Sequence, residues 1–98
     1  MRVVLSARAE AELEQIFTDS VARWGEAQAR RYAEQIDRRL SLLAKISGAG
    51  RARPELGKGV RSISTGSHIA FFKMIEVEIL ILSVRHAKRR TPDAGELI

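Results

Sequence analysis

The sequence predicts a small α+β protein, in which an antiparallel sheet packs against an N-terminal helical hairpin in the order β-α-α-β-β-β. Three observations lead to this fold class. Apolar residues recur at three- and four-residue spacing through the first half of the chain. After residue 59 their spacing changes to two, which is typical of strands. A glycine-rich, basic segment at residues 48–59 separates the two patterns and predicts a loop.

The first half of the chain contains a short strand followed by two amphipathic helices. Residues 3–5 are Val-Val-Leu, and Ser6 is placed to cap the helix that follows. Gly25 ends this helix, and a second helix is expected from about Glu26 to about Ser47. The tight junction at Gly25 predicts an antiparallel hairpin. The expected apolar stripes are Ala9, Leu13, Ile16, Phe17, Ser20, Val21 and Trp24 in the first helix, and Ala29, Tyr32, Ala33, Ile36, Leu40, Leu43 and Ser47 in the second.

The second half of the chain predicts three strands joined by short turns. The strands are expected at residues 60–64, 67–74 and 77–85. Residues 79–82 are apolar on both faces, which is typical of a strand at the centre of a sheet. The first strand is expected to join the same sheet. Because 98 residues suffice for one small core, residues 1–98 are expected to form a single domain.

Composition narrows the classes of function. The chain has no cysteine, and its 2 histidines lack metal-ligand spacing, so neither thiol chemistry nor a metal or other cofactor is expected. No apolar run is long enough to span a membrane, and the N-terminus lacks the apolar region of a signal peptide, so a cytoplasmic protein is expected. The 17 Lys and Arg outnumber the 12 Asp and Glu, with the excess concentrated in residues 27–73. Such a field attracts phosphates or acidic protein segments, although solubility alone also explains it.

Basic residues at the ends of the predicted strands are candidates for chemistry. Arg61 opens one strand, and Arg85 and His86 end another. If these strands are neighbours, the three side chains converge at one rim, where two guanidiniums and an imidazole suit phosphodiester cleavage. A second proton-transfer group is missing, so a strand-end histidine bonded to the backbone is the favoured interpretation of His86. His68, at a hairpin, is likewise expected to satisfy nearby polar groups.

Two aromatic residues on the helical stripes are expected to serve packing. Trp24 is interpreted as a core anchor at the helix–helix corner, and Tyr32 as a core residue with a hydrogen-bonded hydroxyl. Beyond Arg85 the sequence turns polar, so little core is expected in the tail.

The motifs, taken in order, resemble the ParE branch of the RelE/ParE superfamily, the toxins of bacterial toxin–antitoxin operons. The resemblance runs almost end to end. Its motif residues are Leu5, Ser6, Ala9, Leu13 and Ile16; Arg23, Trp24, Gly25, Ala29 and Tyr32; Gly48, Gly50 and Arg51; Gly59 and Arg61; Gly66, Ser67, His68, Phe71 and Phe72; and Val84 and His86. Many ParE-like chains have Arg-Val-Leu-His where this chain has Ser83-Val84-Arg85-His86. Alternation along a strand sends the shifted arginine to the opposite face.

The resemblance implies a toxin that is not itself an enzyme, that blocks DNA gyrase, and that a ParD-like antitoxin neutralises in a hetero-oligomer. The side chains expected to contact the target or another anion are Arg61, Arg85, Lys88, Arg89 and Arg90. The apolar side chains expected to be exposed for the antitoxin are Phe17, Val21, Leu42 and Ile46. Two alternatives stay open. One is a RelE-type ribosome-dependent mRNA endoribonuclease using Arg61, Arg85 and His86, and the other is an antitoxin-binding protein without target activity.

Overall fold

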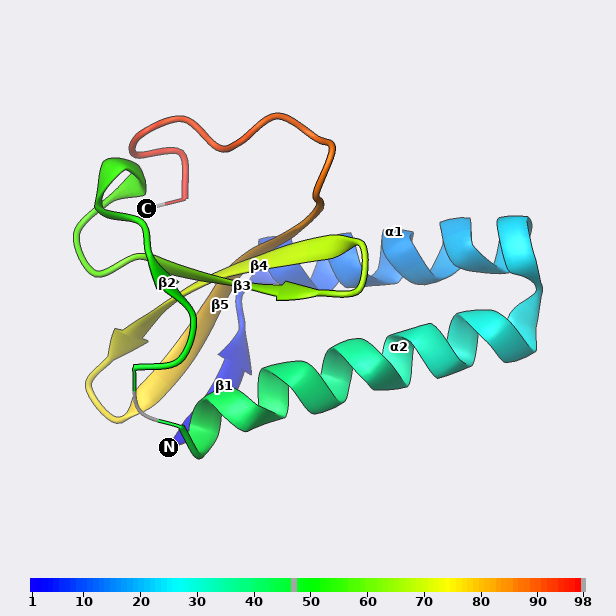
Figure 1. The fold of residues 1–98 in the computed structure, drawn as a ribbon, viewed down its shortest axis with the longest axis horizontal. Coiled ribbons are helices and arrows are strands. Elements are labelled where there is room, and N and C mark those ends of the chain that lie inside the picture. The colour runs from blue at the N-terminus through cyan, green and yellow to red at the C-terminus, as the bar shows by residue number, and fades with distance from the viewer. Residues whose placement is uncertain (47, 98) are drawn as a thin grey trace.

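In the structure, a computed structural model that describes residues 1–46 and 48–97, a helical hairpin lies on one face of a five-stranded sheet (Figure 1). The strand order is β1-β5-β4-β3-β2. The elements are β1 (Arg2–Leu5), α1 (Ala7–Trp24), α2 (Glu26–Ser41), the 3₁₀ helix η1 (Leu42–Ala44), β2 (Arg51–Ala52), the 3₁₀ helix η2 (Pro54–Leu56), β3 (Arg61–Thr65), β4 (His68–Ile75) and β5 (Glu78–His86). The predicted fold class and element order are confirmed, with β2 added inside the segment predicted as a loop.

The helical hairpin begins and turns where the sequence predicts. The Ser6 hydroxyl accepts a hydrogen bond from the Ala9 amide at 3.0 Å, which satisfies one free donor of the first turn of α1. Gly25 adopts φ +85°, a conformation that favours glycine, and its amide bonds the Val21 carbonyl. Helix α2 ends earlier than expected, because the chain tightens into η1 after Ser41. The last position of the predicted second helix, residue 47, lies outside the described residues.

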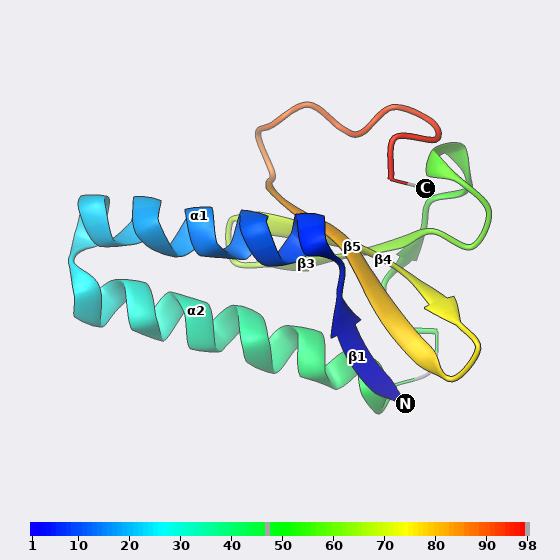
Figure 2. The same ribbon diagram turned by 180° about the vertical axis from the view of Figure 1, so that it is seen from behind.

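Strand β5 is an inner strand of the sheet, between β1 and β4. It pairs antiparallel with β4 and parallel with β1, which lies alongside it at the sheet edge (Figure 2). The three strands β3 to β5 form the predicted antiparallel part, and β1, whose place in the sheet the sequence left open, makes the sheet mixed. A bulge interrupts the β4–β5 ladder, since Phe71 pairs with Ser83 but Phe72 pairs with Ile81. The extra residue, Leu82, shifts the alternation, so that Ile81 and Val84 both face the hairpin core.

The sheet buries apolar side chains on both faces. The larger cluster lies under the hairpin and contains Ile36, Leu40, Phe72 and Ile81. The other face holds a smaller cluster consisting of Leu56, Val60, Phe71, Leu82 and Leu97. The segment after β5 runs back toward η2 to supply Leu97, and the Gly95 amide bonds the Leu56 carbonyl (Figure 1). The expectation that the tail contributes little core is wrong, because this face of the sheet needs the tail as its cover.

The two helical aromatic residues differ in their burial. Tyr32 is half-buried against the larger cluster and its hydroxyl is hydrogen-bonded, as predicted. Trp24 is 57% exposed, so its interpretation as a core anchor is wrong. It is the last residue of α1, at the tip of the hairpin, where the helices extend past the sheet (Figure 1).

Candidate functional site

Arg61 organises the loop before the sheet. Its guanidinium donates hydrogen bonds to three backbone carbonyls, those of Gly48 and Gly50 at 2.9 Å and that of Ala49 at 3.1 Å. Gly50 has φ +82°, and a Cβ there would lie 2.4 Å from the Ser62 carbonyl oxygen, so the loop needs glycine at this position. Arg61 therefore stabilises the close approach of the Gly50 backbone to that of Ser62, and its hydrogen-bond donors are used in this structural role.

The predicted convergence of Arg61, Arg85 and His86 is wrong. Strands β3 and β5 both pair antiparallel with β4, so they run in the same direction on either side of it. Arg61 is the first residue of β3, whereas Arg85 and His86 end β5. Because a strand's first and last residues lie at opposite ends of a sheet, Arg61 is separated from the other two along the strand direction.

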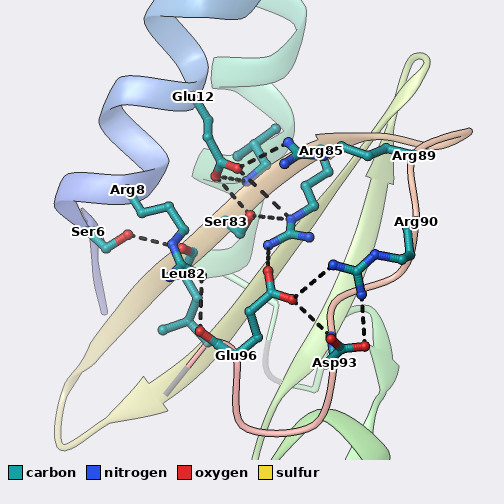
Figure 3. A network of polar contacts seen from close by, with 11 residues as sticks. Ser6, Arg8, Glu12, Leu82, Ser83, Arg85, Arg89, Arg90, Asp93 and Glu96 are labelled. Atoms are coloured by element: carbon teal, nitrogen blue, oxygen red, sulfur yellow. Dashed lines mark hydrogen bonds and ion pairs between the residues drawn. The ribbon is translucent and has the colours of Figure 1, made fainter.

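Arg85 is the centre of a polar network that fastens the tail to the sheet (Figure 3). Its side chain is 5% exposed, bonds the Glu96 carboxylate and donates to the Ser83 hydroxyl at 3.1 Å. The Arg85 guanidinium lowers the pKa of Glu96 to about 2, with help from a bond that the Asp93 amide donates. The Arg85 charge is thus buried and already paired, and its expected contact with an external anion stays a prediction.

Glu12 completes this network from α1 (Figure 3). Strand β1 stops pairing with β5 at Ile81, and no strand of residues 1–46 and 48–97 pairs with this edge of β5 beyond it. One Glu12 carboxylate oxygen fills this role, accepting from the Val84 amide at 3.0 Å and from the Ser83 hydroxyl at 2.8 Å. A helix side chain thus replaces the missing strand.

The cations of the tail have unequal surroundings. Arg90 bonds Asp93 at 2.8 Å and lies 3.8 Å from Glu96, so it belongs to the edge of the same network. Arg89 lies 3.8 Å from Glu12 and is 60% exposed. Lys88 is exposed, and its amide donates to Nδ1 of His86 at 3.1 Å. The favoured interpretation of His86, a histidine bonded to the backbone at a strand end, is confirmed.

A row of aromatic and imidazole rings lies between the hairpin and the end of the sheet at which β5 ends. His68 and His86 are cross-strand partners with ring centroids 5.2 Å apart, and the Tyr32 hydroxyl lies 2.5 Å from Nδ1 of His68. Gly66 makes room for this contact, because a Cβ there would lie 2.5 Å from the Tyr32 ring. Burial, and then the neighbouring His86, lower the pKa of His68, so its ring is neutral at pH 7.

An apolar groove of about 390 Å³ lies between α1, α2 and β1. Its lining includes Leu5, Leu13, Phe17, Ala33 and Ile36. Phe17 is 36% exposed, as expected for a binding surface. The groove has an apolar floor, flanking helices and an adjacent sheet edge, the features with which proteins hold an amphipathic peptide segment.

The other apolar side chains predicted to bind an antitoxin lie outside this groove. Leu42 and Ile46 are exposed, as expected, whereas Val21 is half-buried. Leu42 lines a separate, more polar hollow between α2 and the end of β3, which shares only Asp37 and Ser41 with the groove. The role of all four side chains in binding stays a prediction.

Two classes of site have no support among the described residues. Residues 1–46 and 48–97 contain no group of three or more His, Cys, Asp or Glu side chains that could hold a metal ion. None of the helices in this part of the chain is long and apolar enough to cross a membrane.

Comparison with known proteins connects this geometry to a family. Residues 3–91 match the family described as the ParE toxin of the type II toxin-antitoxin system, parDE. The chain belongs to the ParE toxin family. It is thus the toxin component of a type II toxin–antitoxin system, as the sequence motifs predicted.

Individual relatives cover most of this ParE toxin. Toxin ParE1 of Caulobacter vibrioides is 37% identical over 82 residues, which cover 84% of this chain and 84% of the relative. Toxin ParE1 of Mycobacterium tuberculosis is 34% identical over 88 residues, covering 89% of this chain and 90% of the relative. A solved structure described as a chromosomal ParDE TA system from P. aeruginosa matches with a TM-score of 0.79 and 24% identity, covering 90% of this chain and 97% of that chain. At this identity the structural match shows the fold alone.

The sequence did not reveal the carboxylates that bond the end of β5. Glu12 bonds Val84 across 72 residues of sequence and Glu96 bonds Arg85 across 11, and no local pattern indicates such contacts. The ParE-like motifs did contain a signal for the row of rings, since Tyr32, His68 and His86 were all motif residues. Their mutual contact became visible only in the fold.

Proposed function

We propose that this ParE toxin inhibits DNA gyrase without enzymatic activity of its own, and that a ParD-like antitoxin neutralises it in a hetero-oligomeric complex. The observation that carries the first part is the separation of Arg61 from Arg85. Cleavage of a phosphodiester needs charge stabilisation and proton transfer at one point. Here the Arg61 guanidinium bonds loop carbonyls, and the Arg85 guanidinium is buried against Glu96. Neither guanidinium is therefore available to act together with His86. This arrangement favours a binding inhibitor over a RelE-type nuclease. A cytoplasmic site of action follows from the proposed target.

The experiment that tests the proposed target compares two reactions with the same purified toxin. Gyrase supercoiling of relaxed plasmid should be inhibited, and cleaved-DNA complexes should accumulate when the reaction is stopped with detergent. A cell-free translation reaction with the same toxin should continue, with its messenger RNA intact. Ribosome-dependent cleavage of that messenger would instead establish the nuclease alternative. Inactivity in both reactions, with antitoxin binding retained, would support a toxin-like protein without target activity.

The proposed antitoxin site is the groove between α1 and α2. Its lining is mostly apolar, and Phe17 on its wall is 36% exposed to solvent. An amphipathic segment of the antitoxin laid in the groove would cover this surface and place its acidic residues against a net charge of +5. Co-expression with the product of the neighbouring short reading frame, followed by co-purification, tests whether the complex forms.

A further inference from the structure

A second cleft, of about 600 Å³, lies between α1, the first half of α2, the start of β4 and the end of β5. Its lining combines rings with cations, namely Trp24, Tyr32, His68 and His86 with Arg23, Lys88 and Arg89. The cleft shares Ile16, Ser20 and Tyr32 with the proposed antitoxin groove but faces the end of the sheet at which β5 ends. Neither gyrase inhibition nor antitoxin binding, as proposed above, assigns it a ligand.

The rings form an unbroken row through the cleft. Trp24 meets Tyr32 edge to face with centroids 6.4 Å apart, Tyr32 lies 5.5 Å from His68, and His68 lies 5.2 Å from His86. The row starts at an indole that is more than half exposed and ends at the exposed His86. Flat rings open to solvent at both ends offer stacking surfaces for other flat rings, such as nucleic-acid bases.

Hydrogen bonds on the ring nitrogens orient the two imidazoles. Nδ1 of His86 accepts from the Lys88 amide, so the neutral ring carries its proton on Nε2. The Tyr32 hydroxyl accepts from the Ser67 amide at 2.9 Å, and it is placed to donate to Nδ1 of His68 in preference to the Thr65 carbonyl at 3.4 Å. This assignment leaves an Nε2–H donor on each histidine. Such donors suit phosphate oxygens and the carbonyl oxygens of bases.

The charge of the lining also favours an anionic polymer. Arg23, Lys88 and Arg89 are exposed at the cleft. Two carboxylates, Glu12 and Asp19, also line the cleft, and Glu12 lies 3.8 Å from Arg89. With Arg85 included, the cations of the lining outnumber these two carboxylates. Alternating cations and stacking rings are the combination with which proteins hold single strands, whereas an acidic peptide needs the cations alone.

We propose that this cleft binds single-stranded nucleic acid, with bases stacked on the row of rings and phosphates paired with Arg23, Lys88 and Arg89. The inference deepens the proposed gyrase inhibition and rests on it for the origin of the strand, a DNA segment opened in the gyrase complex. The binding itself requires no gyrase, so it is measured on the toxin alone.

The experiment uses the single tryptophan of the chain as a reporter inside the cleft. A short oligothymidylate should quench Trp24 fluorescence, and a labelled copy should bind with an affinity that falls as salt rises. Replacing Arg23→Ala together with Lys88→Ala should weaken binding about tenfold and reduce the slope of log K against log salt by about 1.4, the value for two lost single-strand phosphate contacts. Trp24→Leu should weaken binding of the labelled strand about tenfold through lost stacking.

Arg31→Ala with Lys58→Ala is the matched control, because it removes two exposed positive charges outside the cleft. It should leave the salt slope and the quenching unchanged. Equal weakening by both double variants, or an oligoglutamate that quenches Trp24 as strongly as the oligonucleotide, would overturn the proposal. Absence of strand binding with gyrase inhibition intact would overturn the cleft assignment alone. Strand binding without gyrase inhibition would support the cleft and refute the proposed target.

Discussion

Arg85, near the end of β5, is bonded through its guanidinium to the carboxylate of Glu96, a residue of the C-terminal segment (Figure 3). The contact joins an inner strand of the sheet to the segment that covers the second face of the sheet. Around it, Ser83 bonds Arg85 from the same strand, and Arg8 on α1 donates to the Glu96 carbonyl at 3.1 Å. The tail is therefore an integral part of the fold, and its charged residues differ in what they contribute.

Removing Arg85 should destabilise the protein. Arg85→Ala deletes a buried charge and leaves the Glu12 and Glu96 carboxylates near one another without their shared cation, so we expect a loss of about 3 kcal/mol in the free energy of unfolding. Urea denaturation followed by circular dichroism measures this loss. Arg90→Ala is the control, since Arg90 pairs with Asp93 at the surface and should change stability by less than about 1 kcal/mol. Equal effects of the two variants would show that burial of Arg85 is not the cause.

The same ion pair predicts a pH dependence. The folded pKa of Glu96, about 2, lies below its ordinary value of 4.5. The unfolded chain therefore binds the proton more readily, so the stabilisation is complete above about pH 4.5 and is lost as the pH falls toward 2. Glu96→Gln should lower stability at neutral pH and flatten the acid limb of a plot of unfolding free energy against pH. An acid limb identical to that of the wild type would contradict this assignment.

Leu97 should be required for full stability even though it lies at the end of the described segment. It is 7% exposed and packs with Leu56, Phe71 and Leu82. Leu97→Ala should cost about 2 kcal/mol, the lower end of the range for buried leucines, because a chain end can partly close the cavity. Leu42→Ala, at a leucine that is 40% exposed, should change stability by less than about 0.5 kcal/mol. Thermal unfolding of both variants makes the comparison.

Most of the helices and strands could be predicted, because the apolar spacing that specifies each of them lies within its own segment of the sequence. The change of apolar period from helical to alternating located the hairpin and β3 to β5, and Gly25 marked the turn correctly. The parallel partner of β5 was not predictable, since four residues of β1 carry no information about register. The two-residue strand β2 was not predicted either, because its pairing with Arg61 and Ser62 depends on the loop that the Arg61 side chain bonds.

The candidate site was less predictable than the fold. The sequence offers Arg85 and Arg90 as similar cations near the end of the chain, although Arg85 is buried against a carboxylate and Arg90 is exposed. Burial of a charge depends on partners that approach from elsewhere in the fold, here Glu12 and Glu96. The sequence motifs did include Tyr32, Gly66 and His68, which lie together in the fold. The tight contact between Gly66 and the Tyr32 ring constrains the residue types at both positions.

Gly66 should not tolerate a side chain. Its φ is +58°, and a Cβ would lie 2.5 Å from Cε1 of Tyr32, so Gly66→Ala combines backbone strain with a clash. We expect a loss of about 2 kcal/mol in stability and displacement of the Tyr32 hydroxyl from His68. The change would appear as a shift of the His68 ring resonances in NMR spectra. Gly95→Ala is the control, since Gly95 also has positive φ but open space around its Cβ position. A loss at Gly66 no larger than at Gly95 would leave only backbone strain as its cause.

Phe17 should govern recognition of the antitoxin if the groove between α1 and α2 is the docking site. Phe17→Glu places a charge on an apolar wall of the groove, so we expect antitoxin affinity to fall by tenfold or more, because aromatic residues at the centre of an interface carry much of its energy. Stability should change little, since Phe17 is 36% exposed. Leu42→Glu introduces the same charge at a similarly exposed residue that lines the separate hollow beside β3. Calorimetric titration of both variants with the antitoxin decides between the two surfaces. Weaker binding of Phe17→Glu alone supports the groove, weaker binding of Leu42→Glu alone moves the antitoxin to the α2–β3 side, and equal losses indicate a segment that wraps around α2 to cover both.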